Sequence, residues 1–191
     1  FNHTGNNSRY FNAQGFYPEL GAAQSQESPY YSWYSFHPWP DDYDAWWGIK
    51  TLPAVQESTD SYRRFIIRDH DSVVRHWLRQ GASGWRLDVA DELPDDFIAE
   101  IRDAMEQENP DSFLLGEVWE DGSNKVAYSQ RRRYLLGSET HGLMNYPFRT
   151  AALDWLRGGD AACFRDTMET IREHYPRPEF YSALNILGTH D

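Results

Sequence analysis

The amino-acid sequence predicts an α/β protein built on a parallel sheet or barrel. Three short, mostly apolar stretches are typical of strands, and segments with helical spacing separate them. The strands do not alternate between polar and apolar residues, which indicates strands buried on both faces, as in parallel sheets. Ionisable residues stand at the carboxyl end of each of the three strands.

The first part of the chain has a different character from the rest. From residue 4 to about residue 56 it is rich in Gly, Asn, Ser, Pro and aromatic residues, and no helical or alternating period persists. This stretch is too long for an ordinary loop, so we expect a subdomain or an elaborate binding loop. The sequence therefore predicts two parts, residues 1–56 and residues 57–191.

The elements of the second part follow in a regular order. Helical spacing over residues 58–81 predicts a helix that Gly81 ends, and GWRLDVA (84–90) predicts the first strand. Pro94 opens a second helix with one apolar stripe. Asn109-Pro110-Asp111 ends that helix, and SFLLGEVW (112–119) predicts a second buried strand.

The remaining segments complete the alternation of helices and strands. SNKVAYSQRRR (123–133) is a polar, basic region, and a weak strand candidate covers residues 141–145. Helices are predicted over residues 148–157 and 160–174. The final segment, SALNILGTHD (182–191), predicts the third clear strand.

Composition and charge limit the partners. The 191 residues are 40% hydrophobic and 16% aromatic, which is typical of a globular protein with a real core. The net charge of −12 disfavours nucleic acid and anionic membranes, whereas a neutral carbohydrate is not repelled. No stretch approaches the ~18–20 apolar residues of a membrane span. Aromatic rings can stack on sugars, although we expect most of these rings in the core.

The single cysteine, Cys163, excludes an intrachain disulfide and a cysteine-based zinc cluster. It is compatible with a reducing compartment, and we expect a cytoplasmic protein. The chain opens on FNHTG without a recognisable signal peptide, so we expect this opening to be an internal segment.

Charged residues at the strand ends point to a catalytic site. Arg86 and Asp88 end the first strand, Glu117 ends the second, and His190 and Asp191 end the third. In an α/β barrel the carboxyl ends of the strands form the rim where catalysis occurs. Side chains two positions apart share a face, so Arg86 can offset the cost of burying Asp88 and keep it ionised.

The two strand-end carboxyls match the needs of one reaction. Glu117 precedes a bulky Val-Trp pair, and a carboxyl in apolar, aromatic surroundings favours its protonated form, suited to a general acid. Retaining glycoside hydrolysis needs one ionised and one protonated carboxyl, about 5–5.5 Å apart across the scissile bond. Asp191 would steady the substrate hydroxyls and the oxocarbenium-like charge. Structural salt bridges are the alternative explanation of these residues.

Several motifs resemble one enzyme family. GWRLDVADE, LLGEVW and LGTHD occur in the order of three signature regions of the α-amylase family of glycoside hydrolases, and the opening FNH resembles the end of another region. SPYYSWYSFHPWP, MNYPFR and NILGTHD resemble the neopullulanase, maltogenic amylase and cyclomaltodextrinase branch. This resemblance implies a partial (β/α)8 TIM barrel, from the end of strand 3 to strand 7, with a long irregular loop subdomain inserted after strand 3.

The resemblance also implies roles for single residues. Asp88 corresponds to the nucleophile and Arg86 to the arginine that fixes it. Glu117 corresponds to the acid/base and Asp191 to the transition-state stabiliser.

Substrate-binding and metal positions follow from the same resemblance. His3 and His190 correspond to the histidines that hydrogen-bond the glucose ring at the cleavage subsite, and Trp119 to an aromatic platform on the leaving-group side. Asn2 stands where calcium-dependent members tie the long loop to the barrel, but this branch often lacks that calcium. We therefore expect that no cofactor is required.

The predicted function is that of a retaining α-glucan hydrolase or transglycosylase acting through an aspartyl glycosyl-enzyme intermediate. The expected bonds are α-1,4, with α-1,6 as a further candidate, and the expected partners are α-glucan oligosaccharides or cyclodextrins. The resemblance also implies a homodimer for the parent enzyme. Because barrel strands 1, 2 and 8 lie outside the chain, we expect a catalytic-region fragment that is inactive alone.

Two alternatives from other classes stay open at this point. The first is a non-catalytic α-amylase-like binding or assembly module, although such relatives typically lose the carboxylates that this chain keeps. The second is a metal-dependent barrel hydrolase with His3, His190 and Asp191 as ligands, which leaves Arg86 and Glu117 unexplained.

Overall fold

The computed structural model describes residues 1–190, which form two compact units. The first unit is Phe1–Val73, and the second begins at Val74. The division predicted at residue 56 follows the change in sequence character and stays a prediction. The fold is α/β with a parallel sheet, as predicted, and the sheet lies in the second unit.

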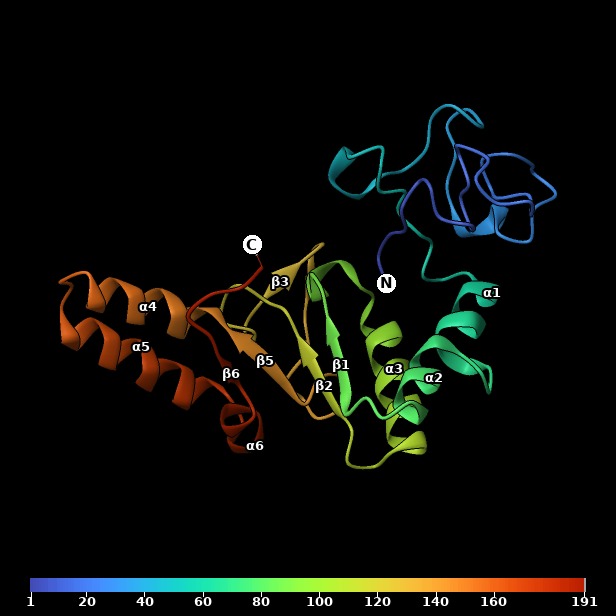
Figure 1. Ribbon diagram of the computed structural model, residues 1–191. Helices are drawn as coiled ribbons and strands as arrows, with labels where there is room; N and C mark the ends of the chain where they lie inside the picture. Colours follow the sequence, from blue (N-terminus) through green and yellow to red (C-terminus); the bar gives the residue numbers. More distant parts are fainter. Residues whose placement is uncertain (191) are drawn as a thin grey trace. The chain divides into compact units, whose positions relative to one another are not determined.

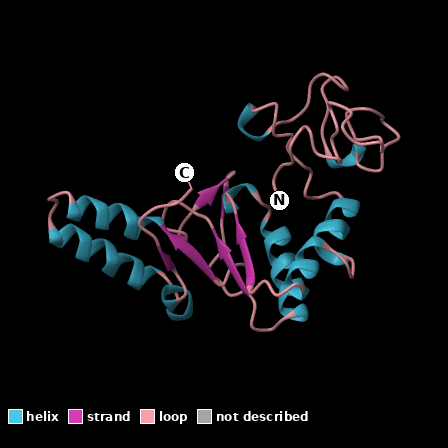
Figure 2. Cartoon of the chain, viewed as in Figure 1, coloured by secondary structure: helices cyan, strands magenta, loops and turns pink. Residues whose placement is uncertain are grey.

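The first unit is mostly loop (Figure 2). Its short helical segments are η1 (Tyr31–Trp33), η2 (Trp46–Gly48), α1 (Asp60–Arg63) and η3 (Arg64–Arg68), the last a turn of π-helix. Aromatic rings make its core: Phe11 meets Tyr34 edge to face with ring centroids 4.9 Å apart, and Trp33 meets Tyr62 at 5.1 Å. These four rings are buried and serve packing.

The single helix predicted over residues 58–81 is wrong, because the chain leaves the helix after η3. A second helix, α2 (Val73–Arg79), begins four residues beyond Asp69 and leads to Gly81, whose φ is +98°. The hydroxyl of buried Ser72 donates a 2.9 Å hydrogen bond to the Ile67 carbonyl. A serine that binds the backbone in this way competes with helical hydrogen bonds and favours a break.

The second unit contains four parallel strands that Figure 1 shows side by side. Their order in the sheet is β1 (Gly84–Leu87), β2 (Phe113–Gly116), β5 (Gly142–Asn145) and β6 (Leu184–Asn185). Because neighbouring strands are all parallel, their carboxyl ends lie at one edge of the sheet. Parallel neighbours need crossover connections. Helices supply those between β1 and β2 and between β5 and β6, whereas the connection from β2 to β5 contains only the short strands β3 and β4.

The crossover helices agree with the predicted ones within a few residues. They are α3 (Asp95–Glu108) between β1 and β2, and α4 (Tyr146–Leu156), α5 (Ala161–His174) and α6 (Arg177–Tyr181) between β5 and β6. The predicted stripe on α3 is buried as expected, with Phe97, Ile98, Ile101 and Met105 fully enclosed. The short helix α6 has no counterpart in the sequence prediction.

Several predicted segments differ in detail. Among the described residues, the strands predicted over 112–119 and 182–191 are observed only as the shorter β2 and β6. The strand expected over residues 84–90 ends at Leu87, and a 3₁₀ turn, η4 (Ala90–Glu92), follows. The polar region 123–133 contains a small antiparallel hairpin of β3 (Val126–Ala127) and β4 (Gln130–Arg131). Each helix within residues 1–190 is too short or too polar to span a lipid bilayer.

Candidate active site

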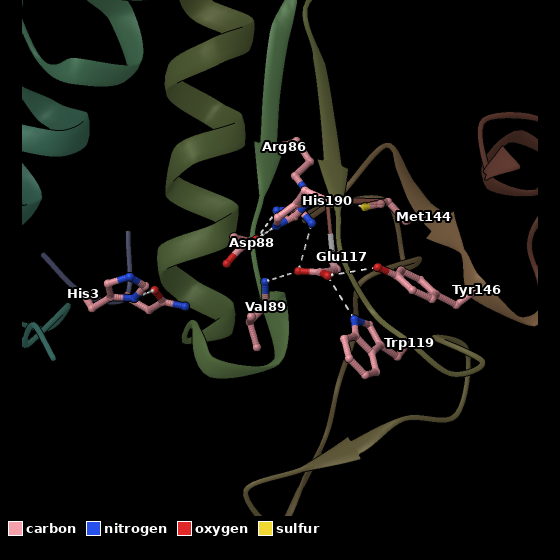
Figure 3. A network of polar contacts seen from close by, with 10 residues as sticks. His3, Arg86, Asp88, Val89, Glu117, Trp119, Met144, Tyr146 and His190 are labelled. Carbon is pink, nitrogen blue, oxygen red and sulfur yellow. Dashed lines mark hydrogen bonds and ion pairs between the residues drawn. The ribbon is translucent and has the colours of Figure 1, made fainter. Parts of the chain in front are cut away.

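Two carboxylates stand at the carboxyl ends of neighbouring strands. Leu87 pairs with Gly116 at the end of the β1–β2 ladder, and the next residues are Asp88 and Glu117. Arg86 and Asp88 share a face, as predicted. Nη1 of Arg86 donates a hydrogen bond to Oδ1 of Asp88 (Figure 3). The parallel register therefore brings the predicted nucleophile and the predicted acid/base to one edge of the sheet.

The Arg86 guanidinium serves both carboxylates. Its Nη2 lies 3.1 Å from Oε2 of Glu117, while its Nη1 forms the ion pair with Asp88. Its Nε donates a 3.4 Å hydrogen bond to the sulfur of Met144 on β5. One cation shared by two carboxylates offsets their mutual repulsion and the desolvation of the buried one.

Glu117 is 2% exposed, and its surroundings combine aromatic side chains, as expected from the sequence, with polar donors that the sequence did not indicate. Oε2 accepts a 2.7 Å hydrogen bond from the Val89 N–H, besides its ion pair with Arg86. Oε1 accepts from Nε1 of Trp119 at 3.0 Å and from the Tyr146 hydroxyl at 3.2 Å. Both carboxylate oxygens are therefore held in place from several sides.

The Val89 donor depends on an uncommon backbone conformation. Val89 has a φ of +44°, in the left-handed region that β-branched residues avoid. Such a residue costs on the order of 1–3 kcal/mol and persists only where its surroundings enforce it. This turn ends β1 early and points the Val89 N–H at the Glu117 carboxylate.

Trp119 and Tyr146 form one aromatic surface beside Glu117. Their rings stack with centroids 5.5 Å apart and an angle of 24°. Trp119 is 56% exposed, which leaves a ring face available, whereas Tyr146 is buried. Sequence reasoning missed Tyr146, although it directly follows β5. The rule that strand ends carry functional residues applied there too, but the strand was predicted only weakly.

At the end of the third predicted strand, the structure describes His190. The side chain of His190 is 66% exposed, and its Nε2 lies 3.9 Å from Oδ1 of Asp88. Asp191, the predicted transition-state stabiliser, lies outside the described residues. Of the predicted site residues in the second unit, the structure thus brings together Arg86, Asp88, Glu117, Trp119 and His190.

His3 and Asn2 belong to the first unit and contact each other. Nδ1 of His3 lies 2.7 Å from Oδ1 of Asn2, and the His3 ring packs against Trp46 at 5.2 Å. The oxygen that Asn2 would offer to calcium is therefore occupied by the His3 ring. Residues 1–190 contain no group of three His, Cys, Asp or Glu side chains placed to hold a metal. The expectation that no cofactor is required stays a prediction.

The chain is similar to known proteins over its whole length. The family described as "Alpha amylase, catalytic domain" matches residues 1–191. The chain belongs to the α-amylase family of glycoside hydrolases. An α-amylase-family relative, the amylopullulanase of Thermoanaerobacterium saccharolyticum, is 36% identical over 100% of this chain and 16% of its own length. Neopullulanase 2 of Thermoactinomyces vulgaris is 29% identical over 78% of this chain and 27% of its own length.

A solved α-amylase-family structure shares the fold over the whole chain. The cyclic α-maltosyl-(1→6)-maltose hydrolase of Arthrobacter globiformis matches with a TM-score of 0.81 and 26% identity, over 100% of this chain and 41% of that protein. That hydrolase has also been solved in complex with cyclic α-maltosyl-(1→6)-maltose. The chain spans only 11–16% of the amylopullulanases it matches.

Proposed function

We propose that the protein containing this chain is a retaining α-glucan hydrolase or transglycosylase. It cleaves α-1,4 glucosidic bonds and, as a second specificity, α-1,6 bonds. The observation that carries this proposal is the single Arg86 guanidinium paired with Asp88 and Glu117 at the ends of adjacent parallel strands. Similarity to a hydrolase of a sugar with a 1→6 linkage supports the second specificity.

The proposed first step forms a covalent intermediate. The Asp88 carboxylate attacks the anomeric carbon of the glucose unit, and the bond from that carbon to the glycosidic oxygen breaks. The electron pair of that bond stays on the leaving oxygen, which takes a proton from Glu117. Arg86 keeps Asp88 in position, and the exposed face of Trp119 receives the leaving sugar.

The second step releases the sugar and restores both carboxyls. Glu117 removes a proton from water, or from the hydroxyl of an acceptor sugar, and the oxygen attacks the anomeric carbon. The ester bond to Asp88 breaks, and two inversions give overall retention of the α configuration. Among the donors around Glu117, only the Tyr146 hydroxyl can also accept a hydrogen bond, so it can follow the change in protonation.

We further propose that the four strands are strands 4 to 7 of a (β/α)8 barrel, with residues 1–3 at the end of strand 3. The match of the whole chain to 41% of a solved relative supports this assignment. In such a barrel residues 1–56 contain the end of strand 3 and the loop subdomain that follows it, and residues 57–191 belong to the partial barrel. His3 and His190 would then bind the glucose unit at the cleavage subsite, and Asp191 would stabilise the transition state.

The test is Asp88→Asn in the complete protein, assayed on maltooligosaccharides and cyclodextrins. We expect kcat to fall by at least about 100-fold, because the nucleophile is lost. The matched control is Asp103→Asn, on the exposed side of α3, which should keep full activity. NMR of the first product should show the α anomer. More than a few per cent residual activity, or an inverted product, would contradict the proposal.

A further inference from the structure

The strained residue Val89 leads directly into the turn η4, which contacts a segment more than thirty residues further along the chain. The N–H of Val89 binds the Glu117 carboxylate, and the next N–H, of Ala90, donates to the Glu117 carbonyl at 3.0 Å. The position of η4 therefore decides whether Val89 can hold Glu117. The contacts that keep η4 in place become part of the site.

Arg132, which follows β4, binds the η4 turn and the residues beyond it. Nη1 donates to the Asp91 carbonyl at 2.6 Å, and Nη2 donates to the Leu93 carbonyl at 2.6 Å and to the Ala90 carbonyl at 3.4 Å. Nε donates to the Asp95 carboxylate at 2.6 Å. Arg132 is 6% exposed, so these bonds form largely out of water.

The planar fork of arginine is what this arrangement requires. Its donors diverge in one plane and reach three carbonyls and a carboxylate at once, whereas a lysine ammonium is a single point of charge. The Arg132 guanidinium also lies over the Tyr134 ring, with its central carbon 4.7 Å from the ring centroid.

Two further side chains from the same segment hold Asp91. The Tyr134 hydroxyl donates to Oδ1 of Asp91 at 2.6 Å, and Nζ of Lys125 lies 3.0 Å from Oδ2. The turn is therefore held through its backbone by Arg132 and through its side chain by Tyr134 and Lys125. A left-handed valine persists only where the structure around it leaves no relaxed alternative, and these contacts supply that constraint.

From these contacts we infer that Arg132 is a positioning residue for Glu117. By holding η4, it keeps Val89 in the left-handed conformation that points its N–H at the acid/base carboxylate. Arg132 reaches Glu117 only through the turn, so its loss should impair proton transfer more than nucleophilic attack. This inference rests on the proposed function, because it assumes that Glu117 is the acid/base.

The test compares two substrates with the variant Arg132→Lys in the complete protein. Maltohexaose needs a proton on its leaving oxygen, whereas α-maltosyl fluoride has a leaving group that departs with little proton assistance. We expect kcat/KM to fall at least about 10-fold for maltohexaose and less than about 3-fold for the fluoride. Glu117→Gln provides the reference pattern for a lost acid. Arg131→Lys is the matched control, since Arg131 is exposed on β4 and should leave both rates unchanged.

Tyr134→Phe is the second variant, because it removes only the hydrogen bond to Asp91 and keeps the buried ring. Tyr134→Phe should show the same selective loss of kcat/KM on maltohexaose, to a smaller degree. If Arg132→Lys does not fold, this variant replaces it in the test. Equal losses on both substrates in the folded variant tested, or no loss on either, would overturn the positioning role. If the unaltered protein turns over neither substrate, the proposed function fails instead.

Discussion

At the scale of single residues, Val89 shows how a strained backbone serves the site. A valine at positive φ is costly, and nothing in its side chain accounts for the conformation. Its N–H donates the shortest hydrogen bond that Glu117 accepts, at 2.7 Å. The strained backbone of Val89 is therefore explained by the hydrogen bond that its N–H donates to Glu117.

This explanation predicts that Val89→Gly keeps its activity. Glycine adopts positive φ without steric cost and retains the N–H, so the bond to Glu117 survives. We expect kcat/KM on maltohexaose within about 3-fold of the unaltered protein. Leu87→Ala is the comparison variant for stability. Leu87 is buried, so truncating its side chain should lower the free energy of unfolding by about 2–5 kcal/mol. A loss above about 10-fold in Val89→Gly would show that the valine side chain itself is needed.

The sequence predicted the charged residues that gather at the strand ends, with Arg86 as a partner of Asp88, but it did not predict all the residues that hold them. Arg86, Asp88 and Glu117 stand in short motifs at strand ends, where position alone indicates their chemistry. Tyr146 and Arg132 reach the site from segments 29 and 42 residues away, by contacts that no local pattern records.

At the scale of elements, the junction of β5 and α4 joins sheet and helix through one side chain. Asn145 ends β5, and its Oδ1 accepts a 3.0 Å hydrogen bond from the Phe148 N–H, which caps α4. Its Nδ2 donates a 2.9 Å hydrogen bond to Oδ1 of Asn185 on β6. One buried asparagine thus fixes the start of a helix and links two strands.

We therefore predict that Asn145→Ala lowers the free energy of unfolding by about 1–3 kcal/mol, through loss of the cap and of the link to β6. Asp160→Ala is the matched control, because Asp160 caps α5 through an exposed 2.8 Å hydrogen bond to the Ala162 N–H. That loss should be smaller, at about 0.5–1 kcal/mol. Chemical denaturation of the complete protein, followed by circular dichroism, measures both. Equal losses would contradict the role of the link to β6.

At the scale of the whole molecule, one buried acid makes stability depend on pH. Glu139 is fully buried, and neither of its carboxylate oxygens has a hydrogen-bond partner within residues 1–190. Burial, together with the nearby charge of Asp95, raises the pKa of Glu139 from 4.5 to about 7. The folded protein therefore keeps this proton over a range in which the unfolded chain loses it.

The sign of the effect follows from the raised pKa. Above pH 4.5 the unfolded chain releases the proton first, so stability falls as pH rises through 7 and then levels. We predict that Glu139→Gln becomes more stable relative to the unaltered protein by roughly 2–3 kcal/mol between pH 5 and pH 8. Denaturation at several pH values measures this, with Glu169→Gln on exposed α5 as the control. Parallel stability curves for Glu139→Gln and the unaltered protein would contradict it.

The sequence by itself determined the parallel α/β class, the main crossover helices and the carboxyls at the strand ends. Those features depend on hydrophobic periodicity, on glycine and proline residues that end helices and strands, and on short motifs, all of which are local. Only the tertiary structure decided that Glu117 is surrounded by donors, that Val89 is left-handed and that Arg132 holds the turn beside it. Such contacts join segments tens of residues apart, so they exist only once the strands have packed together.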